Sequence, residues 1–167
     1  MANKYCVIRT DALAGTHQNA DLVSLRFYNA EDKVAEVENG VIVELKGYEE
    51  GQREVMKAVA ATSASKLNDC AIVAAPEVMY DERKHNLDEF INEAGKAVRG
   101  YIPRSRNIFS VTAEGFVGGS VPAVGGKVGI GANGKLDAAA EGFGECVHIE
   151  TAGRYTYYAI EIGVTEA

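Results

Sequence analysis

The segment 129–135, with the sequence GIGANGK, has the residue types and spacing that come closest to phosphate-binding chemistry in this chain. Its glycines match the G-x-G-x-x-G pattern of dinucleotide-binding loops, and Gly129 to Lys135 match the front of G-x-x-x-x-G-K-[ST]. Position 136 is leucine, which offers no hydroxyl group to a magnesium ion. Both patterns also require a helix directly after the glycines, and 136–141 is too short to form a stable one.

A hairpin turn explains the same segment better. Asn133-Gly134 is the dipeptide favoured at the centre of a type I′ turn, where both residues need a positive φ. The sequence therefore predicts that 126–130 pairs with a short strand at 135–138. A nucleotide-binding enzyme that uses the loop Gly129 to Lys135 is the remote alternative.

The other groups of reactive side chains are incomplete. Cys146 and His148 lie two apart on a predicted strand, so we expect both side chains on one face, but zinc needs three or four protein ligands. Glu49, Glu50 and Glu54 are typical of a solvated turn rather than of an acid–base pair. We therefore expect no catalytic residue, no metal site and no cofactor, and a protein that is not an enzyme.

The composition indicates an ordinary globular protein of 167 residues, 47% hydrophobic and 25% charged. Its formal net charge of −7 opposes general binding to nucleic acid, and no apolar run is long enough to span a membrane. Cys6, Cys70 and Cys146 are odd in number and form no C-x-x-C pair, which favours reduced, buried thiols. We expect no nucleic-acid partner, no membrane partner and synthesis in a cytoplasm.

Short runs of β-branched and aromatic residues, separated by turn residues, predict a mostly β protein. A second Asn-Gly dipeptide, Asn39-Gly40, predicts another hairpin, between 33–38 and 41–46. The remaining predicted strands are 5–8, 22–28, 54–59, 71–74, 108–113, 145–150 and 155–162.

One amphipathic helix is predicted at Asn86 to Arg99. An apolar stripe recurs at helical spacing, Asn86 can cap the start with Glu89 as its capping-box partner, and Gly100 suits the end. The stripe consists of Leu87, Phe90, Ile91, Ala94 and Val98.

The predicted fold class is therefore α+β and mostly β, with antiparallel strands and hairpins, one amphipathic helix and a small C-terminal β-barrel or sandwich. The expected organisation is a mostly β N-terminal subdomain at 1–82, a linker and helix at 83–103, and a barrel-like C-terminal subdomain at 104–167.

Six segments of the chain are similar to small structural proteins that tailed bacteriophages of Firmicutes encode near their major capsid protein. These segments are 41–45 (VIVEL), 49–55 (EEGQREV), 76–83 (PEVMYDER), 90–101 (FINEAGKAVRGY), 108–112 (IFSVT) and 153–158 (GRYTYY). The resemblance implies a virion component, and in first place a decoration or cementing protein bound to the lattice of the major capsid protein on the capsid exterior. A tail tube or tail-associated protein is the alternative, and a homo-oligomer is compatible with both.

Arginine and aromatic side chains are the residue types that anchor protein interfaces. The tyrosines of 155–158 alternate across a predicted strand, so we expect at least one ring to face outward beside Arg154. The candidates for contact with the partner are Arg83, Arg99, Tyr101, Arg154 and Tyr157.

Overall fold

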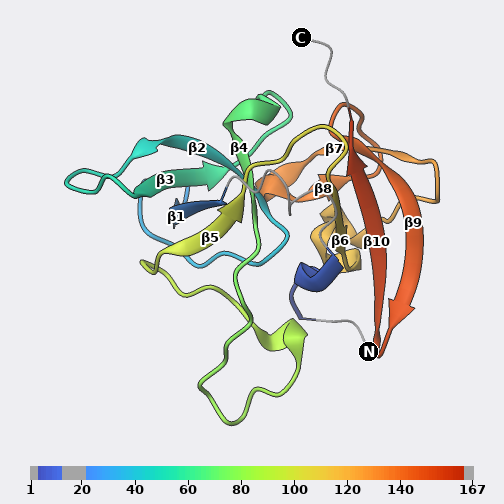
Figure 1. Ribbon diagram of the computed structural model, residues 1–167, viewed down its shortest axis with the longest axis horizontal. Coiled ribbons are helices and arrows are strands. Elements are labelled where there is room, and N and C mark those ends of the chain that lie inside the picture. Colours follow the sequence, from blue (N-terminus) through green and yellow to red (C-terminus); the bar gives the residue numbers. More distant parts are fainter. Residues whose placement is uncertain (1–3, 13–21, 164–167) are drawn as a thin grey trace.

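The computed structural model describes residues 4–12 and 22–163, and its strands form two sheets that lie side by side (Figure 1). The first is a closed barrel with the strand order β1-β3-β2-β4-β5, in which β1 pairs with β3 in parallel and all other pairs are antiparallel. Its strands are β1 (Leu22–Tyr28), β2 (Ile42–Tyr48), β3 (Val55–Ala60), β4 (Cys70–Val73) and β5 (Val98–Tyr101).

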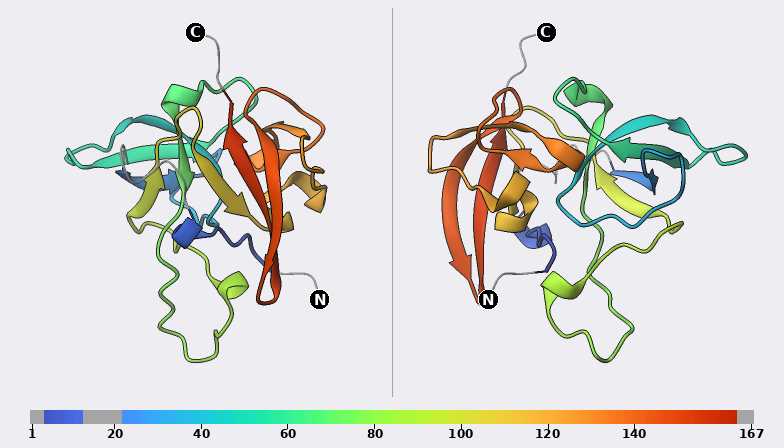
Figure 2. Two further views of the ribbon diagram at one scale, coloured as in Figure 1. Left: turned by 45° about the vertical axis from the view of Figure 1, so that its right-hand side comes forward. Right: turned by 180° about the vertical axis from the view of Figure 1, so that it is seen from behind.

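The second sheet is open and antiparallel, with the strand order β6-β10-β9-β7-β8. Figure 2 shows the long β9–β10 hairpin standing at the side of the molecule away from the barrel. The strands are β6 (Ile108–Val111), β7 (Lys127–Ile130), β8 (Leu136–Asp137), β9 (Gly144–Ala152) and β10 (Tyr155–Ile162). Six 3₁₀ turns complete the described elements: η1 (Thr10–Ala12), η2 (Leu67–Asp69), η3 (Leu87–Glu89), η4 (Ala113–Gly115), η5 (Val117–Gly119) and η6 (Ala132–Gly134).

The predicted mostly β class is confirmed, and most predicted strands form close to their expected bounds. The closed barrel, however, is built by the strands between 22 and 101, whereas the strands between 108 and 162 form the open sheet. The expected strand at 5–8 makes only an isolated bridge, from Ile8 to Val111.

One of the two predicted hairpins is confirmed. Asn133 and Gly134 have φ angles of 56° and 71°, and the strands on either side of them pair, with Ile130 opposite Leu136. The prediction of a hairpin at Asn39-Gly40 is wrong, because β2 pairs with β3 and β4 and not with 33–38. Gly40 does have the expected positive φ, 83°, and its N–H donates to the carbonyl of Val73 on β4.

The predicted helix at 86–99 does not form. Only η3 is helical there, Phe90 is already extended (φ −79°, ψ 135°), and Gly95 has a φ of 78°. A helix of this length is marginal in isolation, so tertiary contacts decide its conformation. Asp88 and Asn92, which lie off the apolar stripe and would face away from it in a helix, are instead buried in hydrogen-bonded contacts.

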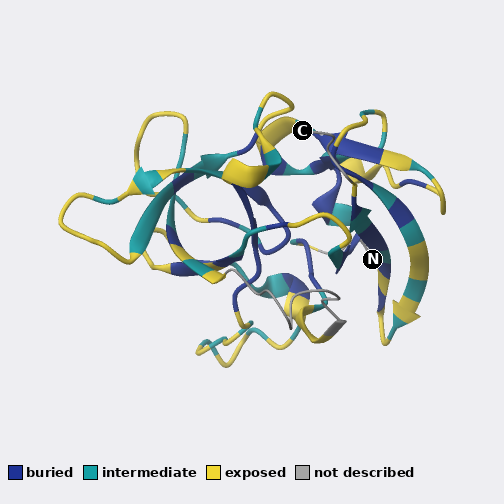
Figure 3. Cartoon of the chain, turned by 45° about the horizontal axis from the view of Figure 1, so that its top comes forward, coloured by how far each residue is buried: buried dark blue, intermediate teal, exposed yellow. Residues whose placement is uncertain are grey.

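Alternation along the barrel strands divides the core in two, because successive side chains point to opposite faces. On β2 and β4, Val43, Ala71 and Val73 fill the barrel, while Ile42 and Ile72 point outward to the second sheet. Figure 3 shows the resulting change between buried and exposed residues along the strands.

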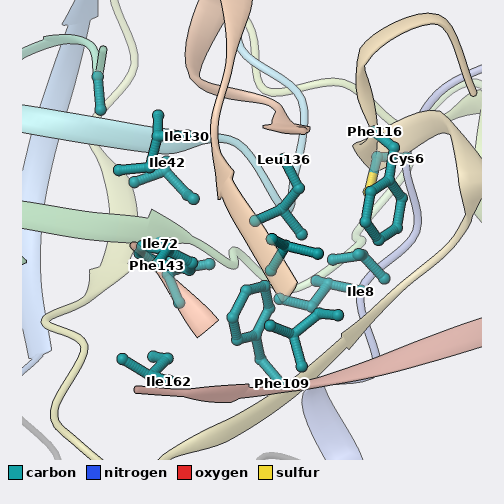
Figure 4. Packing of buried hydrophobic residues seen from close by; sticks show 14 of the residues in the cluster. Cys6, Ile8, Ile42, Ile72, Phe109, Phe116, Ile130, Leu136, Phe143 and Ile162 are labelled. Atoms are coloured by element: carbon teal, nitrogen blue, oxygen red, sulfur yellow. The ribbon is translucent and has the colours of Figure 1, made fainter. Parts of the chain in front are cut away.

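The larger core cluster lies between the two sheets and joins them. Ile42 and Ile72 of the barrel lie among Phe109, Leu136 and Ile162 of the second sheet and its connections (Figure 4). All five are nearly or completely buried. This cluster is therefore a core that the barrel and the second sheet share.

Candidate partner interface

The connection from β4 to β5 leaves the body of the molecule as a long loop at 74–97, seen at the bottom of Figure 1. Apart from η3 and one isolated bridge, it contains no regular secondary structure. Loops of this length without structure of their own are uncommon in compact domains and are usually functional when ordered. The loop is ordered by polar contacts at two places.

The first anchor joins the loop to the barrel through two buried asparagines. The Asn39 side chain accepts a hydrogen bond from the N–H of Ala75 (3.0 Å) and donates to the carbonyl of the same residue (2.9 Å). The Asn92 amide donates to the carbonyl of Val37 (2.9 Å) and to Oδ1 of Asn39 (3.1 Å). These contacts satisfy the buried amides and hold both ends of the loop against 37–39.

The second anchor joins the loop, at η3, to the second sheet. The hydroxyl of Tyr155, at the start of β10, donates to Oδ1 of Asp88 (2.7 Å), and a guanidinium nitrogen of Arg154 lies 3.6 Å from the same oxygen. Burial opposes the charge on Asp88, but the hydrogen bonds from Tyr155 and from the Lys4 backbone, with Arg154 nearby, outweigh it and lower the pKa of this carboxyl. Asp88 is therefore a charged anchor at neutral pH.

A groove of about 720 Å³ lies between this loop and the paired strands β1 and β5 of the barrel. Its lining combines apolar side chains of both walls with the exposed Arg99 of β5. Tyr80 is 93% exposed, Val78 is 57% exposed, and both belong to the lining. The remaining apolar lining includes Leu22, Phe90 and Ile91. Large apolar side chains grouped in this way mark interaction surfaces.

Two of the predicted interface residues belong to this region. Arg99 lines the groove, and Arg83 lies on the loop with its side chain 89% exposed and paired with Asp81 at 2.9 Å. Tyr101 is at the end of β5 but faces the shared core, where its ring is partly buried. Tyr101 therefore has a packing role in the free protein.

The other two predicted interface residues lie near β10 and differ in exposure. Tyr157 is only 4% exposed, packs with Val7 and Tyr155, and has the Arg9 guanidinium 5.7 Å from its ring, so its ring does not face outward. Arg154 is exposed and lies over the Tyr155 ring at 5.3 Å. Its position supports the second anchor of the loop.

The loop Gly129 to Lys135 has the geometry of a hairpin. It is followed by β8, and its lysine is already occupied: Nζ of Lys135 lies 3.2 Å from Oε1 of Glu38 and donates to the carbonyl of Glu114 at 3.0 Å. A Cβ on Gly134 would lie 2.1 Å from the carbonyl oxygen of Ile42. This turn is therefore a contact between the second sheet and the barrel.

Cys146 and His148 do not share a face of β9, which corrects the expectation from their spacing. The register shifts by one residue between Cys146 and His148, so Cys146 points into the shared core and His148 is exposed. In the described residues, no cluster of three or more histidine, cysteine or acidic side chains has the geometry of a metal site. The three cysteines are free and buried, as predicted, and burial raises the pKa of Cys6 to about 12.

The acidic turn contains one residue that is not solvated as expected. The Glu49 side chain is largely buried, accepts a hydrogen bond from Tyr28 and pairs with Arg26 of β1. Glu50 and Glu54 are exposed as predicted. Glu49 therefore has a structural partner within the barrel.

The sequence did not single out Val78 and Tyr80 as candidate interface residues. Both lie in a stretch without helical or strand periodicity, where side-chain exposure cannot be read from a repeat. The available signal was an apolar and aromatic pair in a long polar connection, where a solvated loop needs neither.

Comparison of the chain with models of known protein families, with curated proteins and with solved structures finds no match. None of the helices in the described ranges has the length and apolar character needed to span a bilayer.

Proposed function

We propose that this protein is a non-enzymatic phage structural protein that binds the outer surface of the capsid and stabilises it. The proposal rests on the resemblance of the segments between 41 and 158 to phage structural proteins and on the surface of the 74–97 loop. Its partner is the lattice of the major capsid protein, and its place is the exterior of the virion.

The observation that carries the proposal is that exposed apolar groups stand on an anchored loop. Val78 and Tyr80 lie between the anchors at Ala75 and Asp88, each of which is hydrogen-bonded to another part of the fold. Preorganised contact groups lose less conformational freedom on binding than groups on an unrestrained loop. The loop and the neighbouring Arg99 thus supply aromatic, aliphatic and arginine contacts suited to a desolvated interface.

Stabilisation follows from linkage. A protein that binds the assembled shell and not its loosened form shifts the equilibrium toward the assembled form by its binding free energy. Contacts of this apolar kind are little affected by salt, whereas exposed ion pairs are screened beyond roughly 8–10 Å. We expect the protein to remain on purified particles through about 1 M salt, in which this screening length falls to about 3 Å.

The test compares two exposed tyrosines on particles that lack the protein and are then incubated with purified variants. Tyr80→Ala should weaken attachment about tenfold or more, since truncation of an interface hot spot typically costs about 2 kcal/mol or more. Tyr48→Ala is the matched control, because Tyr48 is 66% exposed on β2 and does not line the groove. Calorimetry should show that shells without the protein open at lower temperature. Intact particles recovered from infected cells at low salt with none of this protein attached would refute the proposal.

A tail tube protein is the alternative that a specific observation favours. Part of the β9 edge is free of strand partners among the described residues, and tube rings can close by strand addition. Rings or helical assemblies seen by negative-stain microscopy would support this alternative over the capsid proposal.

A further inference from the structure

Part of the β9 edge is uncovered in the described part of the second sheet. The barrel is closed and has no edge strand. The outer side of β6 is covered by the segment at 7–9, which exchanges backbone hydrogen bonds with Ser110 and Thr112, and β8 is bridged by Phe116. On β9, β7 pairs only with 144–145, so Val147–Thr151 has a strand neighbour on one side alone.

Backbone groups at the centre of this edge point outward. Ile162 on β10 exchanges hydrogen bonds of 2.9 and 3.0 Å with 106–107, so its N–H and C=O point toward the β6 side. The bulge lies on β9, so β10 alternates regularly and Tyr158, four residues earlier, also points toward β6. Ile149 is opposite Tyr158, and its N–H and C=O therefore point away from β10.

We propose that a second copy of this chain adds to this edge, so that two β9 strands pair antiparallel about a two-fold axis with Ile149 opposite Ile149 of the second copy. In this register the outward N–H and C=O of the two Ile149 residues exchange hydrogen bonds. The result is one continuous sheet across the dimer. Isologous two-fold contacts are the commonest symmetry of protein assemblies.

The side chains along the edge support this register. His148 lies opposite Glu150 of the second copy, and the reverse pair forms by symmetry, in the closer, non-hydrogen-bonded positions of the ladder. Each Glu150 keeps its own ion pair with Arg9 at 2.9 Å. Ile149, which is 37% exposed, becomes covered by its symmetry mate. A pairing centred on Glu150 would instead oppose Glu150 to Glu150, which is unfavourable.

The extent of the edge limits the pairing to Val147–Thr151. Beyond it on one side, the N–H and C=O of Cys146 already bond to Gly126 and Gly125 at 2.9 and 2.7 Å. On the other side the chain turns at Gly153. The register centred on Ile149 is symmetric within this stretch, since the bulge residue Val147 then lies opposite Thr151 of the second copy.

Single cysteines at two neighbouring positions test the register. Ile149→Cys should form a disulfide-linked dimer under mild oxidation, because Cα atoms of directly opposed strand residues lie about 5.5 Å apart, within disulfide range. Thr151→Cys is the matched control, because its symmetry mate is displaced by four residues, roughly 13 Å along the strand. The native thiols are buried and do not compete. Crosslinking of Thr151→Cys, or of neither variant, would overturn the register.

Charged substitutions at positions 148 and 150 give a second, non-covalent test, in which sedimentation equilibrium measures the dissociation constant of the dimer. His148→Glu places like charges opposite each other and should weaken the dimer about tenfold. Adding Glu150→Lys should restore it, because only the proposed register opposes these two positions. A wild-type protein that stays monomeric at several hundred micromolar, or that forms rings, contradicts the proposal.

Discussion

Gly134 shows how one residue serves both a turn and a contact between sheets. Its φ of 71° suits the type I′ turn, and a Cβ would overlap the carbonyl of Ile42 on β2. Gly153 lies in the turn between β9 and β10 with a φ of 62°, and a Cβ added there would meet no atom within 4 Å. A substitution at Gly153 therefore tests the cost of a positive φ alone, whereas a substitution at Gly134 adds the cost of steric overlap with β2.

We predict that Gly153→Ala costs about 1 kcal/mol from positive φ alone. Gly134→Ala should cost more, about 3 kcal/mol or above, because the backbone of β2 must also move. Urea denaturation of both variants measures the difference. Equal losses would mean that the turn is not pressed against the barrel.

The buried carboxylate of Asp88 predicts a specific pH dependence. Its pKa is lowered in the folded protein, so its stabilising contribution is present above the unfolded value of about 3.9 and is lost as the pH falls through the lower folded value. Asp88→Asn should cost about 1–3 kcal/mol at pH 7 and progressively less below pH 4. Asp69→Asn, at an exposed position, is the control. A cost for Asp88→Asn that is the same at pH 7 and pH 2 would contradict this role.

At the scale of elements, the 74–97 loop depends on its anchors rather than on a helix. Asn92→Ala removes two hydrogen bonds to the segment at 37–39 and leaves Oδ1 of Asn39 with one donor fewer. We predict a loss of about 1–3 kcal/mol. Hydrogen exchange should rise mainly within 76–97, because local opening releases the loop without the barrel.

The control for this prediction is Asn68→Ala, an exposed asparagine in η2. It should leave both stability and exchange unchanged. Uniform exchange across the barrel and the loop in Asn92→Ala would show that the loop is not a separate opening unit.

At the scale of the whole molecule, the shared core predicts one cooperative unfolding transition. Ile72 lies on a barrel strand, is 4% exposed and packs in the cluster that contains Phe109 and Ile162. Ile72→Ala should cost about 2–5 kcal/mol. It should lower hydrogen-exchange protection in β10 as much as in β4, because both sheets bury surface in the same cluster.

A fragment that ends at residue 103 tests whether the barrel can fold without the second sheet. It removes the second sheet and exposes Ile42 and Ile72, which face that sheet across the core. We expect the fragment not to fold cooperatively. A stable, cooperative fragment would show that the barrel is an independent domain.

The sequence by itself determined the local β-structure. Runs of β-branched and aromatic residues predicted the bounds of β1, β3 and β10 to within one residue, and Asn133-Gly134 specified its turn, because these features depend on neighbours along the chain. The buried thiols also followed from residue type, since an unpaired cysteine behaves as a small hydrophobic group.

Only the tertiary structure decided which strands pair, the conformation of 86–99 and the surroundings of the candidate interface residues. Barrel closure and the burial of Tyr157 depend on contacts between segments far apart in the sequence. The helical pattern at 86–99 was real but weak, and the long-range hydrogen bonds of Asp88 and Asn92 outweighed it. A single bulge placed Cys146 and His148 on opposite faces. Local patterns encode which conformation a segment prefers, whereas the partners that override the preference exist only after the chain has folded.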